Sequence, residues 1–138
     1  MPGYIIGGLA ARIAAALCIF AVALPYALRR RSFRPPQARQ KCAPSYLRRL
    51  WPHFWVGYAI LALSTLHAGT AMDTMPRANR TGVVAATAAF FLLVFELALG
   101  LALKNVNLSS RRPLRRLHFW IMTAFITVLA LHIWMNGH

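Results

Sequence analysis

One stretch of the sequence occurs twice, and it restricts what this chain can fold into. Residues 48–67 run from a basic pair into His-Phe-Trp and on through apolar residues to a second histidine, and residues 115–132 do the same. The four histidines are His53, His67, His118 and His132. In each copy the histidines are 14 residues apart. Fourteen residues of α-helix rise about 21 Å and make nearly four turns, so each pair lies on one helix face.

Composition places these segments in a membrane. The chain of 138 residues is 59% hydrophobic, yet it carries 16 Lys and Arg against 2 acidic residues. A soluble domain does not combine such apolarity with so one-sided a charge, whereas membrane spans joined by basic cytoplasmic loops do. The basic residues cluster at the ends of apolar segments, which favours anionic lipids as partners and argues against nucleic acid.

The apolar segments predict the fold. They cover residues 3–28, 52–72, 81–103 and 114–135, which predicts an all-α, four-helix transmembrane bundle forming a single membrane domain over residues 1–138. Thirteen Lys and Arg fall in the loops at 29–50 and 104–116, against two in the loop at 73–80. The positive-inside rule therefore predicts both termini outside, in a bacterial inner membrane or its equivalent.

The relative direction of the spans decides how the histidines pair. The second and fourth spans run parallel, so His53 and His118 share the inner level of the membrane, and His67 and His132 share the outer level. Each pair can supply two neutral imidazoles to the iron of one haem, from opposite faces. The sequence lacks Cys-x-x-Cys-His, so the two haem b groups are expected to be non-covalent, with all four histidines as metal ligands.

Two other interpretations stay open. A chlorophyll needs one axial ligand, so an antenna subunit with these histidines would hold four pigments in a small bundle. A cofactor-free structural subunit would use the histidines as hydrogen-bonding groups. A shared metal ion is weaker, because ligands about 21 Å apart on one helix cannot meet at one ion.

Charged residues near the histidines are further candidates. Five arginines are placed to meet haem propionates: Arg12, Arg48, Arg49, Arg115 and Arg116. Charge anchoring at the membrane surface explains the last four equally well, and snorkelling to the head groups explains Arg12. Glu96 lies about 10 Å from the inner end of its span, as a protonated structural group or as a quinone or proton site.

Small residues indicate close helix contacts in the first and third spans. They are Gly7, Gly8, Ala11, Ala15, Ala85, Ala86 and Ala89. Residues without bulk let helix backbones approach in a membrane, and in a cofactor-binding bundle they also leave room for a macrocycle.

The histidine pattern resembles the haem-binding core of cytochrome b from quinol–cytochrome c oxidoreductases, and it is similar to ferric-reductase-like transmembrane proteins. The resemblance implies one haem b between His53 and His118 and another between His67 and His132. The loops are too short for a flavin, nicotinamide or iron–sulfur domain, so we expect an electron-transfer subunit of a larger respiratory or photosynthetic complex, not a complete enzyme. Its expected partners are other membrane or peripheral electron-transfer subunits, with quinone as a possible ligand. The expected outside termini are opposite to the cytochrome b arrangement.

Overall fold

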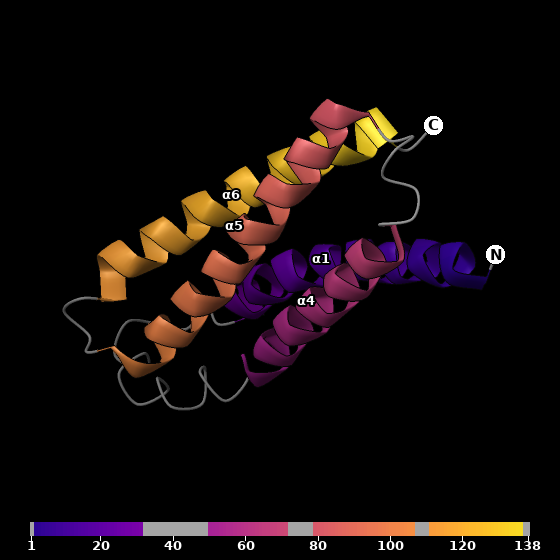
Figure 1. The fold of residues 1–138 in the computed structure, drawn as a ribbon. Helices are drawn as coiled ribbons and strands as arrows, with labels where there is room; N and C mark the ends of the chain where they lie inside the picture. The colour runs from indigo at the N-terminus through magenta and orange to yellow at the C-terminus, as the bar shows by residue number, and fades with distance from the viewer. Residues whose placement is uncertain (1, 32–49, 72–78, 107–110, 137–138) are drawn as a thin grey trace, which may run out of the picture. The chain divides into compact units, whose positions relative to one another are not determined.

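The computed structural model describes residues 2–31, 50–71, 79–106 and 111–136. These ranges contain the helices α1 (Pro2–Arg31), α4 (Trp51–Ala71), α5 (Arg80–Asn105) and α6 (Arg111–Asn136), and no strand (Figure 1). The all-α class is therefore confirmed. Arg48 and Arg49 lie outside the described residues.

All four described helices are long and apolar enough to cross a membrane. Their ends fall within a few residues of the expected spans. Large apolar side chains remain exposed along them, among them Ile19 (72%), Phe91 (67%) and Trp134 (76%). Such side chains would be unfavourable in water, whereas lipid tails solvate them. The chain is therefore consistent with a multi-pass membrane protein.

Local signals explain where the helices begin. The side chain of Asn79 accepts a hydrogen bond of 3.0 Å from the backbone N–H of Thr81, which caps α5. Pro52 lies in the first turn of α4, where its missing N–H leaves no bond unmade. At the other end of α5, a guanidinium nitrogen of Arg111 donates to the carbonyl of Leu103 at 3.3 Å, so α6 begins tied to the last turn of α5.

The chain divides into two compact units, at residues 1–68 and 69–138. The first contains α1 and most of α4, and the second contains α5 and α6. In the second unit, α5 and α6 are an antiparallel pair that contact each other near both ends (Figure 1). The sequence-based expectation of a single membrane domain stays a prediction.

Each unit carries the same stripe of small buried residues on its first helix. In α1 the stripe is Gly7, Ala10 and Ala14, and in α5 it is Gly82, Ala85 and Ala89. The second set lies 75 positions after the first, residue for residue. The spacings of three and four residues put each stripe on one helix face.

The second helices of the units match as well. Ile60 of α4 and Phe125 of α6 are buried, and they are 65 positions apart, the same offset as the histidines. The repetition thus extends from the histidine segment to the whole helix pair. Of the small residues named from sequence, Gly7, Ala85 and Ala89 are buried, whereas Gly8 is exposed.

Candidate functional site

His67 lies near the end of α4 and is half-buried. Its Nδ1 atom is 3.1 Å from the backbone carbonyl oxygen of Gly7, in the first two turns of α1. A carbonyl oxygen can only accept a hydrogen bond, so Nδ1 must carry the proton and donate it. In the neutral ring this leaves the lone pair on Nε2, the form in which imidazole ligates a metal.

His132 has the equivalent contact in the second unit. Its Nδ1 atom is 3.0 Å from the carbonyl oxygen of Gly82, near the start of α5. Gly82 corresponds to Gly7 in the repeated stripe, 75 positions later, and His132 corresponds to His67, 65 positions later. Both histidines of the predicted outer level are therefore held through Nδ1 by a glycine carbonyl of the neighbouring helix.

The side chain of Asn136 packs against both His132 and Gly82. Its side-chain nitrogen is 3.2 Å from Nδ1 of His132, and a Cβ atom added to Gly82 would overlap the Asn136 amide. Nδ1 cannot both donate to the Gly82 carbonyl and accept a hydrogen bond from Asn136, and the carbonyl is the closer of the two and can only accept, whereas the oxygen and nitrogen of an amide can exchange places. The bond from Nδ1 to the carbonyl is therefore favoured, and Gly82 is required for the close packing.

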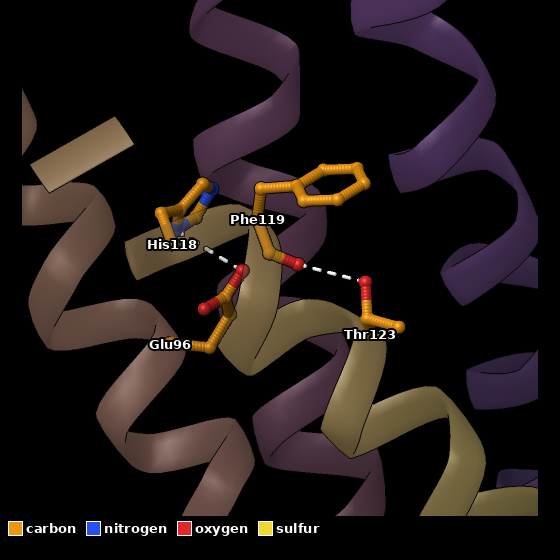
Figure 2. A network of polar contacts seen from close by, with 4 residues as sticks. All are labelled: Glu96, His118, Phe119 and Thr123. Carbon is orange, nitrogen blue, oxygen red and sulfur yellow. Dashed lines mark hydrogen bonds and ion pairs between the residues drawn. The ribbon is translucent and has the colours of Figure 1, made fainter. Parts of the chain in front are cut away.

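His118, on the predicted inner level, has a different neighbour. Figure 2 shows the Glu96 side chain of α5 turned toward the imidazole of His118 on α6, with Nδ1 and Oε1 3.0 Å apart. The two atoms are within hydrogen-bonding distance, but their geometry is not that of an ordinary hydrogen bond, so this is a close polar contact. The side chains are 21% and 13% exposed.

The surroundings of this pair are tight. A Cβ atom at Gly100, one turn after Glu96, would lie 3.8 Å from Cε1 of His118, so the ring lies over this glycine. The second carboxylate oxygen of Glu96 is buried and has no hydrogen-bond partner within the described ranges. The proposed quinone or proton role of Glu96 stays a prediction.

His53 is half-buried in the first turns of α4, with its ring centroid 6.2 Å from that of Phe54. The repeat shows how its surroundings differ from those of His118. The position 75 residues before Glu96 is Ala21, so the first unit carries no carboxylate at the corresponding place on α1. The two inner-level histidines therefore differ in this neighbour, whereas the two outer-level histidines share the contact with a glycine carbonyl.

The described candidate arginines are exposed: Arg12, Arg115 and Arg116. Arg12 lies five residues after Gly7, which turns it roughly 140° away from the stripe of small residues on α1. Arg115 and Arg116 lie in the first two turns of α6, before His118. Their predicted contact with haem propionates stays a prediction.

Sequence reasoning identified the histidines but not the groups that hold them. The glycines gave one detectable signal, the Gly-x2-Ala-x3-Ala pattern repeated 75 residues apart, whereas Asn136 gave none. Within the described ranges no three His, Cys, Asp or Glu side chains gather to hold a metal ion. A haem iron takes only two protein ligands, so the predicted sites do not require such a cluster.

No family model, curated protein or solved structure matches this chain. The members of each predicted histidine pair belong to different units. The pairing of His53 with His118 and of His67 with His132 is therefore still a prediction.

Proposed function

We propose that the chain is a di-haem b-type cytochrome subunit that passes electrons across a membrane. The observation that carries the proposal is the contact of His67 and His132, through Nδ1, with the carbonyls of Gly7 and Gly82. A structural histidine that bonds a carbonyl through Nδ1 takes the same tautomer, so the contact supports the proposal through its repetition at two matched places and through what it leaves free. An axial ligand needs this arrangement, because its Nε2 lone pair must be available and its ring fixed.

In this proposal the four helices form one bundle, with one haem b between His53 and His118 and one between His67 and His132. Each haem supplies one-electron redox chemistry when bound. The chain's apolar side chains exclude water, which holds the dielectric constant low around each site. The helical rise of about 21 Å between the histidines of one helix keeps the two sites at different depths.

The basic residues fit the same proposal. Arg115 and Arg116 are exposed at the start of α6, where they can meet propionates or anionic lipid head groups. The chain contributes no flavin, nicotinamide or iron–sulfur site to this scheme, so electrons come from and go to partner subunits or a quinone. Both termini lie outside, by the charge of the loops.

An absorption spectrum of the purified protein tests the proposal. The dithionite-reduced minus oxidised spectrum should show b-type haem bands, and a pyridine haemochrome assay should give two haem b per chain. Extracted chlorophyll in place of haem would support the antenna interpretation. A protein that is colourless after expression with adequate haem supply would contradict the proposal.

A further inference from the structure

We propose that Glu96 is a positioning residue for His118. Its carboxylate accepts a hydrogen bond from Nδ1–H of His118, so that the ring presents Nε2 to iron in one fixed orientation. This inference rests on the proposed function, because it assigns His118 as an axial ligand. It adds a role for the one acidic residue within the described ranges.

The contacts of the imidazole carry the inference. Oε1 of Glu96 is 3.0 Å from Nδ1 of His118, so an acceptor lies against the ring atom that is remote from the ligating nitrogen. Glu96 and Gly100 are one helical turn apart on α5, and the ring lies over Gly100. The proposal requires Nδ1–H to point at this oxygen when the ring ligates iron.

The burial of Glu96 indicates that the contact is not incidental. A carboxyl group 13% exposed within a membrane-spanning helix is costly to place unless another group satisfies it. Its partner is a histidine that is itself 21% exposed. A metal-ligating histidine commonly donates its second ring N–H to a carboxylate or a carbonyl, which fixes the tautomer and the ring plane.

The repeat makes the assignment specific to one site. The outer-level histidines both use glycine carbonyls, and Ala21 stands where Glu96 would have its equivalent in the first unit. The helix pairs share the contact between a histidine and a glycine carbonyl, and Glu96 is a polar difference between them at the predicted inner level, as Asn136, whose equivalent is Ala71, is at the outer level. The effect of Glu96 should therefore fall on the haem bound by His118 and not on the other.

Three full-length variants test this inference: Glu96→Leu, Glu96→Gln and Thr123→Val. Leu removes the acceptor, whereas Gln retains an oxygen that can accept from Nδ1. Thr123 is the matched control, because it lies on α6 near His118 but bonds elsewhere. Its hydroxyl donates a hydrogen bond of 2.9 Å to the carbonyl of Phe119 (Figure 2).

Electron paramagnetic resonance of the oxidised proteins is the main measurement, because the g-values of low-spin ferric haem depend on the orientation of the axial imidazoles. Glu96→Leu should shift or broaden one of two low-spin signals and leave the other unchanged. Glu96→Gln should restore a sharp signal, and Thr123→Val should match the parent. Redox titration of the two haems should assign the change to the same haem.

The outcomes separate the two proposals. A parent protein without haem would contradict the proposed function before any variant is made. Two haems in the parent with identical signals in Glu96→Leu would overturn the positioning role alone. Loss of one haem in Glu96→Leu that Glu96→Gln restores supports the role. Loss of both haems in Glu96→Leu, or a haem that stays lost in Glu96→Gln, would overturn it, because the effect should fall on one site and a neutral acceptor of the same shape should suffice.

Discussion

Nδ1 of His67 lies 3.1 Å from the carbonyl oxygen of Gly7, a residue 60 positions earlier in the chain. Hydrogen bonds between membrane helices contribute on average about 0.6 kcal/mol, so this bond adds little to the stability of the α1–α4 pair. Its larger consequence is geometric, since it fixes which ring nitrogen carries the proton. The equivalent bond from His132 to Gly82 has the same consequence in the second unit.

His67→Ala and His132→Ala should each remove one haem, and the same one. Both variants then retain one haem b per chain by pyridine haemochrome assay, with identical reduced spectra and one common midpoint potential. The physical reason is that an iron with one of its two axial imidazoles missing is held weakly. Thr65→Val is the control for His67, because the Thr65 hydroxyl is exposed and bonds only one turn back, to Leu61. Loss of different haems in the two variants would contradict the pairing across the units.

Gly82→Ala should destabilise the second unit, because the new methyl group overlaps the Asn136 amide. Overpacking typically costs about 1–3 kcal/mol, and the helix preference for alanine over glycine offsets about 1 kcal/mol of it, so the net loss should be about 0–2 kcal/mol. Thermal unfolding in detergent, followed by circular dichroism, should show a lower midpoint. The double variant Gly82→Ala/Asn136→Ala should recover most of the loss, since neighbouring substitutions that share a clash are not additive.

Gly8→Ala is the matched control for the glycine substitution. A Cβ atom at Gly8 meets nothing within 4 Å, and the residue lies in a helix in the corresponding part of α1. Its unfolding midpoint should stay equal or rise slightly, because alanine is favoured over glycine in a helix by about 1 kcal/mol. Equal destabilisation by the two substitutions would show that the Asn136 contact is not the cause.

The helices could be predicted from sequence because apolar runs bounded by charged residues leave few alternatives in a membrane. The outer-level histidines were identified from their spacing, but their bonding partners were not. A backbone carbonyl leaves no mark of its own in a sequence, and Gly7 resembled any small residue on a close-packed face. The contact of Glu96 with His118 was missed for a related reason. It depends on the relative rotation of α5 and α6, which neither helix fixes alone.

Arg115→Gln/Arg116→Gln should lower the midpoint potential of the haem bound by His118. Positive charge near a haem favours its reduced form, so removing two arginines three and two residues before that histidine favours the oxidised form. The shift should be small, because exposed charge pairs contribute about 0–1 kcal/mol. Lys104→Gln is the charge control, since Lys104 is exposed on α5. An equal shift in the control would indicate a general effect of membrane-surface charge, without a propionate contact.

A reporter fused after residue 138 should be active only on the non-cytoplasmic side, and one inserted in the loop at 104–116 should be active only in the cytoplasm. The reason is that 13 Lys and Arg lie in the two loops predicted inside, against two in the loop predicted outside. Moving four basic residues from loop 29–50 to loop 73–80 should produce a mixed topology, because the difference then falls from eleven to three. Unchanged orientation in that variant would mean that a partner subunit or haem insertion, and not loop charge, determines the topology. In either orientation the second and fourth spans remain parallel, so the pairing of the histidines is unaffected and only the direction of the electron path reverses.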